Sequence, residues 1–271
     1  MAAHQKLPPL CAKFGRALNG ETKGLEQILQ DDAALDRIAV ALASEEQNNV
    51  ALTGPAGCGK TTTVRMLASL IEEGRYARLA GRRVCELNID LINQERDKRD
   101  LRFKHILDEA EYYGIIIYVD EAHRLSENSG PTNLLNTLKP YITSGGISML
   151  ISTTSEEFQR YIACDRAIER RFQAIELKEP NRERLLGIIE RVARVRYPRT
   201  VVTRGAVEET ARLAALCAPE RSEPARSLEL LHYEISAAQI DLPPGEHAAR
   251  IEAEDAKAAA SLKTDGAAGG A

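Results

Sequence analysis

The sequence predicts an α/β protein in which a parallel sheet covered by helices precedes a small C-terminal helical domain. Helix-like stretches separate the apolar runs, and this alternation favours crossover connections and a parallel sheet with both faces covered. After Pro180 the pattern changes to helical periodicity without further strand-like runs. The runs that we interpret as buried strands are Val50–Leu52, Val84–Ile89, Ile115–Val119 and Ile147–Ser152, with Ile175–Leu177 as a candidate fifth.

Composition and periodicity divide the 271 residues into four segments. Residues 1–44 are predicted to be a helical lead-in, and residues 45–179 hold the predicted sheet. Residues 180–241 are predicted to form the helical domain, in which Asn181 and Thr203 are suited to cap helices. Residues 242–271 are rich in Ala, Gly and charge, so we expect a disordered tail. The apolar residues at helical spacing in the lead-in are Leu25, Ile28, Leu29, Leu35, Ile38 and Leu42.

Composition also narrows the class of protein. The hydrophobic share of 44% and the charged share of 28% are ordinary for a globular protein. The absence of Trp and the aromatic share of 4% argue against a base-stacking surface, and the net charge of -4 carries no overall nucleic-acid signal. No segment reaches the roughly 18 apolar residues of a membrane span. Five scattered cysteines without C-x-x-C spacing indicate reduced thiols, so we expect a cytoplasmic protein with no membrane partner.

One segment fits the phosphate-binding pattern G-x-x-x-x-G-K-[ST] in full. It follows an apolar run and opens a helix-like stretch, which is the context that the pattern requires. Glycines let successive backbone N–H groups turn toward phosphate oxygens, and the helix N-terminus adds partial positive charge. We expect Lys60 to reach the β- and γ-phosphates of ATP and the Thr61 hydroxyl to hold Mg²⁺. The predicted nucleotide-binding residues are Gly54, Pro55, Ala56, Gly57, Cys58, Gly59, Lys60, Thr61 and Thr62.

A second motif is an apolar strand that ends in two acids, Asp120 and Glu121. Ligands of a parallel sheet bind beyond the carboxyl ends of its strands, so this pair should lie beside the phosphate loop. Asp120 would then hold Mg²⁺ through water, and Glu121 would polarise the attacking water as a general base. Thr153 ends the next strand, where its hydroxyl can sense the γ-phosphate. The alternatives are an acidic cap on a core strand and a turn-forming threonine.

The adjacent arginines Arg170 and Arg171 lie outside the predicted nucleotide pocket. An arginine supplied by a neighbouring subunit stabilises transition-state charge in ATPases, which makes this pair a candidate for a site completed across a subunit interface. The alternative interpretation is a solvated basic turn, or an ion pair with Asp165 or Glu169.

In their order and spacing these motifs resemble the AAA+ ATPases, and within that class the first ATPase module of the Clp unfoldases and disaggregases. The resemblance covers roughly residues 7–240 and extends to three further stretches. These stretches are Gly81–Val84, Asn136–Pro140 and Asp165–Gln173.

The resemblance implies a role for each matching residue. Lys60 and Thr61 would form the first nucleotide-binding motif, and Asp120 and Glu121 the second. Thr153 would be the first sensor. The resemblance further implies a hexameric ring or a related spiral, with ATP bound between subunits. The arginines that it implies are Arg170 and Arg171, acting in trans as arginine fingers, and Arg226, acting as the second sensor on a helical lid.

The chain departs from the Clp pattern in residues 93–104, which we call the charged segment. Clp unfoldases carry an aromatic residue that grips polypeptide at this position, whereas this segment lacks the tyrosine and the glycine of that context. Phe103 is predicted to belong to the following helix core. The segment instead holds five basic residues and three acids. We favour a solvated loop with mutual ion pairs over a contact with nucleic-acid phosphates.

Three functions remain open at this level. The first is an ATPase that remodels a protein or protein complex, with an unknown protein substrate or adaptor. The second is a DNA-associated AAA+ regulator, such as a loader or a transposition-type ATPase, for which the arginine-rich stretch 182–199 leaves room. The third is a slow nucleotide switch that scaffolds a partner, and Glu121 argues against it because a switch needs no general base.

Overall fold

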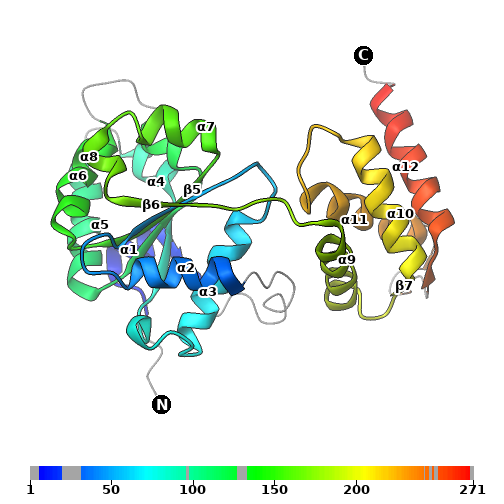
Figure 1. Ribbon diagram of the computed structural model, residues 1–271, viewed down its shortest axis with the longest axis horizontal. Coiled ribbons are helices and arrows are strands. Elements are labelled where there is room, and N and C mark those ends of the chain that lie inside the picture. Colours follow the sequence, from blue (N-terminus) through cyan, green and yellow to red (C-terminus); the bar gives the residue numbers. More distant parts are fainter. Residues whose placement is uncertain are drawn as a thin grey trace. The chain divides into compact units, whose positions relative to one another are not determined.

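The computed structural model describes residues 6–19, 32–95, 98–126, 133–240, 242–243, 246 and 250–268. The chain divides into two compact units (Figure 1). The described residues up to Leu177, apart from the loop 55–59, form an α/β unit. The second unit begins at Lys178 and is helical, and the loop 55–59 is grouped with it. Within the described ranges, no helix combines the length and the apolar character needed to cross a membrane.

A six-stranded sheet in the order β1-β3-β4-β5-β2-β6 forms the centre of the α/β unit. The pairs from β3 to β6 are all parallel, and only β1 runs antiparallel to its neighbour β3. The phosphate-loop strand β2 therefore lies between β5 and β6, and the strand with the acidic pair, β4, lies beside β5. The strands are β1 (Gly15–Ala17), β2 (Asn49–Thr53), β3 (Val84–Leu87), β4 (Ile116–Val119), β5 (Ser148–Thr153) and β6 (Phe172–Glu176).

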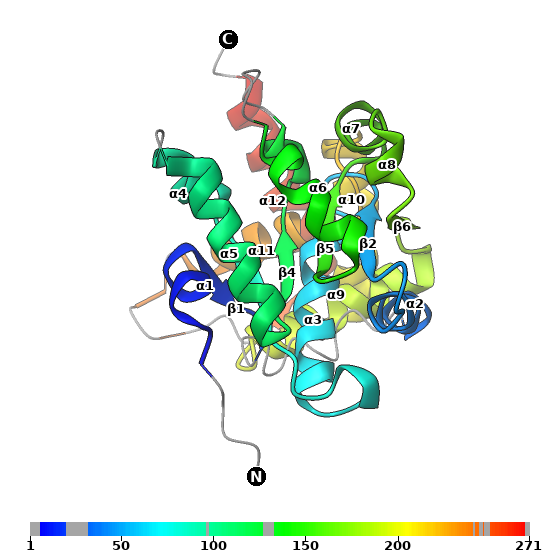
Figure 2. The same ribbon diagram turned by 90° about the vertical axis from the view of Figure 1, so that its left-hand side faces the viewer.

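Helices cover both faces of this sheet, with α5 and α6 on one side and α2 and α3 on the other (Figures 1 and 2). Local sequence signals define where these helices begin and end. In α6, for example, Asn133 caps the N-terminus, and Gly145 ends the helix with a left-handed φ of 74°. The helices of this unit are α1 (Pro9–Phe14), α2 (Asp32–Leu42), α3 (Lys60–Glu72), α4 (Ile89–Gln94), α5 (Arg99–Tyr113), α6 (Leu134–Ser144), α7 (Ser155–Glu157) and α8 (Arg166–Glu169), with the short turns η1 (Ala77–Leu79), η3 (Ala122–Leu125) and η4 (Phe158–Ile162).

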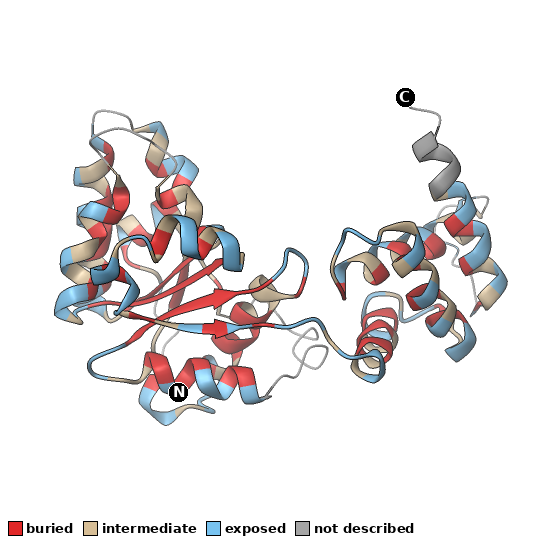
Figure 3. Ribbon diagram, turned by 45° about the horizontal axis from the view of Figure 1, so that its top comes forward, coloured by how far each residue is buried: buried red, intermediate tan, exposed pale blue. Residues whose placement is uncertain are grey.

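The central strands are buried along their whole length (Figure 3). Strands covered on both faces must be apolar throughout, which is why they appear in the sequence as continuous apolar runs. The four predicted strands and the doubly covered sheet are confirmed. The candidate fifth strand is also present as β6, although it begins at Phe172, three residues before the predicted start.

The N-terminal lead-in is not wholly helical as predicted. After α1 the chain forms β1, which pairs with β3 and adds an antiparallel edge to the sheet. Gly15 permits this close approach, because a Cβ there would lie 2.5 Å from the carbonyl oxygen of Glu86. The predicted helical spacing holds in α2, where Leu35, Ile38 and Leu42 are buried. The other predicted positions, Leu25, Ile28 and Leu29, lie outside the described residues.

The second unit is helical, and the predicted caps are present. Asn181 accepts a hydrogen bond from the N–H of Arg184 at the start of α9, and Thr203 accepts one from Ala206 at the start of α10. Its elements are α9 (Arg182–Arg196), α10 (Arg204–Cys217), α11 (Ala225–Gln239), α12 (Ala253–Ala268) and the parallel pair β7 (Val201–Val202) and β8 (Arg250–Ile251).

The prediction of a disordered tail at 242–271 is wrong for most of the residues that the structure describes there. Helix α12 packs on α10 and α11 through Ala256, Ala259 and Ala260, which are at most 5% exposed. Lys263 adds an ion pair to Glu229 of α11 at 2.9 Å. Alanine is the strongest helix former, and its small side chain lets helices approach closely, so docking here does not need large apolar residues.

A carboxyl group is buried where α10 and α11 meet. Glu234 is 1% exposed, and its Oε2 lies 2.9 Å from the hydroxyl oxygen of Thr210. That hydroxyl has one proton and also lies 2.7 Å from the carbonyl oxygen of Ala206. The Thr210 hydroxyl donates to Glu234 Oε2, which favours the charged carboxylate, whereas burial favours the neutral acid. Burial raises the pKa of Glu234 to about 7, with Asp255 adding to the rise and the Thr210 contact opposing it.

We therefore expect stability to fall with rising pH. The pKa of Glu234 is higher in the folded chain than its ordinary value of 4.5, so its contribution is complete below about pH 4.5 and is lost as pH rises through about 7. The unfolding free energy should drop by up to about 3 kcal/mol over this window. Glu234→Gln, which mimics the protonated form, should flatten the slope in urea unfolding followed by circular dichroism. The exposed control Glu254→Gln should keep it, and an unchanged slope in Glu234→Gln would contradict the assignment.

Candidate nucleotide site

The phosphate loop leaves the buried strand β2 and enters α3 at Lys60. Gly54, Gly57 and Gly59 have φ values of 151°, 86° and 101°. Side chains rarely adopt such values, so these positions require glycine. The loop therefore leads directly into a helix N-terminus, where unpaired N–H groups and the helix dipole favour an anion.

Lys60 and Thr61, the first two residues of α3, lie where the loop predicts them. The ammonium group of Lys60 donates to the carbonyl oxygen of Gly54 at 2.8 Å, so this side chain folds back along the loop that it follows. The hydroxyl of Thr61 donates to Asp120 Oδ2 at 2.8 Å. This hydrogen bond joins the two predicted motifs, which are 59 residues apart in the chain.

Asp120 has three donors around its carboxylate. Besides Thr61, it accepts from the hydroxyl of Ser152 and, at 3.1 Å, from the N–H of Glu121. The Tyr118 hydroxyl lies 3.0 Å from Ser152 Oγ, and burial raises the pKa of Tyr118 well above its ordinary value. Sequence reasoning missed Ser152 and Tyr118 as supports of the site. The available signal was a pair of polar groups in otherwise apolar strands, because a buried hydroxyl needs a partner.

The carboxylate of Asp120 and the hydroxyl of Thr61 fit a magnesium ion. Both are hard oxygen ligands, they lie within hydrogen-bond distance of each other, and they stand at the carboxyl edge beside the phosphate loop. Protein sites for Mg²⁺ supply one or two such ligands and leave the rest to phosphate and water. The residues present therefore suit Mg²⁺ bound together with a nucleotide.

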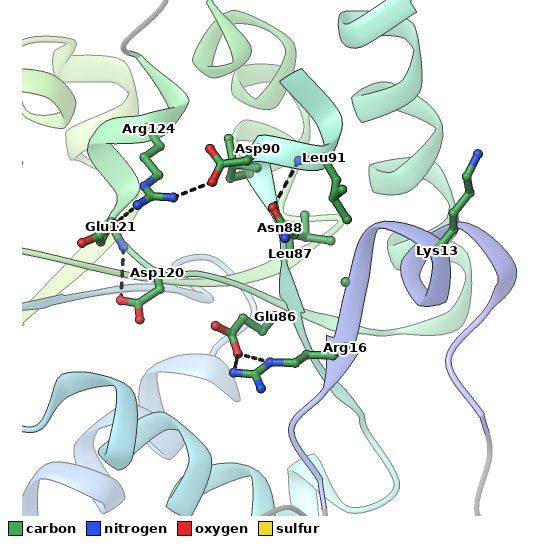
Figure 4. Close-up of a pocket in the computed structure, with 12 residues that line it drawn as sticks. Lys13, Arg16, Glu86, Leu87, Asn88, Asp90, Leu91, Asp120, Glu121 and Arg124 are labelled. Carbon is green, nitrogen blue, oxygen red and sulfur yellow. Dashed lines mark hydrogen bonds and ion pairs between the residues drawn. The ribbon is translucent and has the colours of Figure 1, made fainter. Parts of the chain in front are cut away.

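Glu121 follows Asp120 in a left-handed conformation, with φ of 55° and ψ of 61°. It is the only residue other than glycine with positive φ in the part of the chain that the structure describes. Its carboxylate pairs with the guanidinium of Arg124, and the same guanidinium contacts Asp90 Oδ2 of α4 at 2.8 Å. The three side chains line a pocket of about 470 Å³, with Lys13 and Arg16 on its other side (Figure 4).

Thr153 stands at the end of β5, in register with Thr53 at the end of β2. Its hydroxyl donates to Glu157 Oε2 at 2.8 Å, Glu157 also accepts from the N–H of Thr154, and its Oε1 lies 3.4 Å from Nδ1 of His123. Burial alone would raise the pKa of Glu157, but these donors outweigh it and hold the pKa below the ordinary value. The structure thus places Thr153 at the predicted edge, tied to Glu157, which sequence reasoning did not identify.

Arg170 and Arg171 lie at the opposite edge of the sheet. They precede Phe172, which pairs with Asn49 at the start of β2, whereas the phosphate loop follows Thr53 at its end. Four residues of strand separate the two edges by ~13 Å. The predicted alternative of an ion pair with Asp165 is not seen, since Asp165 pairs with Lys139 at 2.7 Å and caps α8. The arginine pair therefore lies away from the nucleotide site of its own chain.

Arg226 lies in the helical unit. Its guanidinium pairs with the buried Glu223 at 2.6 Å and donates to the carbonyl oxygen of Arg221 at 2.9 Å. The structure thus brings Lys60, Thr61, Asp120, Glu121 and Thr153 to one edge of the sheet and gives Arg226 partners of its own unit.

In the charged segment, Arg102 pairs with Glu95 at 2.9 Å and Arg99 with Asp100 at 3.3 Å. Phe103 lies in α5 and is fully buried in the core, as predicted. These pairs agree with the predicted mutual ion pairs, but the predicted solvated loop is wrong for most of the segment. Residues 93–94 end α4, residues 99–104 begin α5, and Arg99 is buried. Two of the charged positions, Arg96 and Asp97, lie outside the described residues.

Comparison with known proteins agrees with this geometry. Residues 50–179 match the family described as "ATPase family associated with various cellular activities (AAA)". Among curated relatives, the chaperone protein ClpB of Tropheryma whipplei is 27% identical over 85% of this chain and 34% of its own length. ClpB 1 of a Nostoc species is 30% identical over 90% of this chain and 29% of its own length. The chain thus spans about a third of the length of these relatives.

Solved structures of Hsp104 share the fold. Hsp104 with ATPγS and FITC casein has a TM-score of 0.84 at 23% identity, covering 95% of this chain and 46% of that one. The Saccharomyces cerevisiae Hsp104–ADP complex has a TM-score of 0.74 at 23% identity, covering 85% and 34%.

Residues 50–179 therefore match the AAA family, and the parallel sheet and the joined motifs agree with that match. The chain is similar in sequence to the Clp chaperones and in fold to Hsp104.

The glycines of the loop allow a direct test of the site. Gly59→Ala should weaken binding of a fluorescent ATP analogue at least tenfold, because a side chain at φ of 101° distorts the loop that faces the phosphates. Gly74→Ala is the matched control: Gly74 also has positive φ, at 80°, but has open space around it and lies outside the loop. The control should lose stability while keeping affinity. Equal affinity in both variants would argue against phosphate binding at this loop.

Proposed function

We propose that this protein hydrolyses ATP with Mg²⁺ to remodel a protein or protein complex, at a site completed by a neighbouring copy of the chain. The observation that carries the proposal is the hydrogen bond from Thr61 to Asp120, which joins the two nucleotide motifs at one edge of the sheet. Its cysteines carry no disulfide among the described residues, in keeping with the cytoplasmic location expected from the sequence.

Each residue of the edge has a task in this reaction. The loop N–H groups and Lys60 bind the phosphates, while Thr61 and Asp120 hold the ion. When bound, Mg²⁺ neutralises charge on the β- and γ-phosphates. Glu121 orients the attacking water and accepts its proton, and Thr153 stands where a hydroxyl can contact the γ-phosphate.

Completion by a neighbour is supported by the position of Arg170 and Arg171. They lie at the sheet edge away from their own loop, and Arg170 is exposed. In a ring or spiral, each chain would present this edge to the nucleotide of the next. A finger of this kind raises the turnover of ATPases by about 10³–10⁵.

A protein partner is supported by the relatives, which are named chaperones, and by Hsp104 solved with casein. This chain lacks the aromatic residue that grips polypeptide in Clp unfoldases, so we favour remodelling of an assembly over threading of an unfolded chain. The ion pairs within the charged segment engage Arg99 and Arg102 with acids of the same segment, which leaves these two arginines less available for DNA phosphates.

We expect Glu121→Gln to bind ATP and Mg²⁺ as the wild type does and to lose at least a hundredfold in turnover, because the amide cannot accept a proton. Phosphate release and binding of radiolabelled ATP measure the two effects. Lys60→Ala, which should fail to bind ATP, is the control. Unchanged turnover in Glu121→Gln would remove its assigned role.

The same trapped variant separates the two classes of partner. In ATP it should retain a co-purifying protein and release it in ADP. Binding to duplex DNA that appears with ATP and weakens steeply with added salt would instead support the DNA-associated alternative.

The shared site predicts rescue between two inactive variants. Arg170→Ala/Arg171→Ala chains keep their pockets, and Lys60→Ala chains keep their arginines, so mixed interfaces should hydrolyse ATP. Turnover should be highest near an equal mixture. Arg182→Ala/Arg199→Ala, which removes two exposed arginines of the helical unit, should be active alone. No rescue in chains shown to co-assemble would contradict a shared site.

A further inference from the structure

Glu121 presents a positioning problem that the two nucleotide motifs do not solve. Its side chain is 54% exposed, and an exposed carboxylate samples several rotamers. Its left-handed backbone turns the chain sharply after Asp120, so the two neighbouring carboxylates point in different directions (Figure 4). A general base works only when its oxygen is held close to the water that it deprotonates.

One guanidinium holds this carboxylate. Arg124 lies three residues later in η3, and one of its nitrogens pairs with Glu121. The short helix that carries it is fixed to the core, because Ala122 and Leu125 are at most 2% exposed. The backbone at Arg124 is therefore held in place even though its side chain is 38% exposed.

A second carboxylate holds the guanidinium. The other terminal nitrogen of Arg124 contacts Asp90 Oδ2 at 2.8 Å. Asp90 is in the first turn of α4, and the cap residue Asn88 anchors that turn at the end of β3. A planar guanidinium bridging two carboxylates has its orientation set from both sides, which a lysine cannot reproduce.

Stability alone does not explain this arrangement. Exposed ion pairs contribute little to folding, and the three side chains are all more than a third exposed. What the bridge does determine is the direction of the Glu121 carboxylate at the rim of the pocket (Figure 4).

We propose that Arg124 is a positioning residue that aims the Glu121 carboxylate for ATP hydrolysis, and that Asp90 holds Arg124 in place. The inference rests on the proposed function, since it assigns a role within the same reaction. It also links the base to α4, the helix that leads into the charged segment.

The proposal predicts a loss in kcat without a loss in binding. Arg124→Ala should lower kcat about tenfold, while the affinity for ATP stays within twofold, because the base is misdirected and the phosphate contacts are intact. Arg124→Lys should recover part of the loss, since it restores the charge but not the bridge. Asp90→Asn should lower kcat by a smaller factor.

Arg212→Ala is the matched control. Arg212 forms an exposed pair with Glu209, also three residues apart, in the helical unit. It should leave kcat unchanged, and both Arg→Ala variants should unfold at the wild-type temperature.

A second measurement does not depend on turnover. In the full chain labelled with ¹⁵N-arginine, the side-chain signal of Arg124 should shift in Glu121→Gln and in Asp90→Asn, while that of Arg212 stays in place. If wild-type kcat is measurable and Arg124→Ala matches it, the positioning role is overturned. If the Arg124 signal has the same chemical shift in both variants as in the wild type, the bridge does not exist in solution. If the wild type has no ATPase activity but the Arg124 signal shifts in both variants, the proposed function is refuted and the bridge is still supported.

Discussion

The hydrogen bond between Thr61 and Asp120 depends on the parallel sheet that surrounds it. In a parallel sheet every strand delivers its carboxyl end to the same edge, so residues far apart in the chain meet without any long loop. The order of the strands places β5 between the phosphate-loop strand and the acidic strand. That arrangement brings Ser152 against Asp120 and puts Thr153 beside both motifs. Burial of the strands on both faces keeps this edge rigid.

The polar residues at this edge hold one another. Asp120 receives three donors and Glu157 receives two together with an imidazole, so the acids have fixed positions. Glu121 differs, because its carboxylate pairs with Arg124 of η3 and its backbone adopts a strained left-handed conformation. Strain at such a position is common where function needs a side chain in an unusual direction.

Some of this could be predicted from residues alone and some could not. Local patterns locate a strand, a loop or a helix cap, so Gly54–Thr61, Asp120 and the caps Asn181 and Thr203 were within reach. Partners chosen by tertiary contact were not, because Ser152 meets Asp120 on the neighbouring strand and Asp90 meets Arg124 from a separate helix. The prediction of a disordered tail failed for a related reason. Ala256 and Ala259 look uninformative as single residues, and their value appears only against the helices that they contact.

The edge strand β1 has a consequence for how this protein is made. Arg16 pairs with Glu86, seventy positions later in the chain, and Gly15–Ala17 finds its neighbours only in β3. Among the described strand pairs of this sheet, β1–β3 needs the least chain, because it can form once Leu87 has left the ribosome, whereas β2 must wait for β5 and β6. The side of the sheet beside the Glu121 pocket can therefore pair before the phosphate-loop strand finds its neighbours.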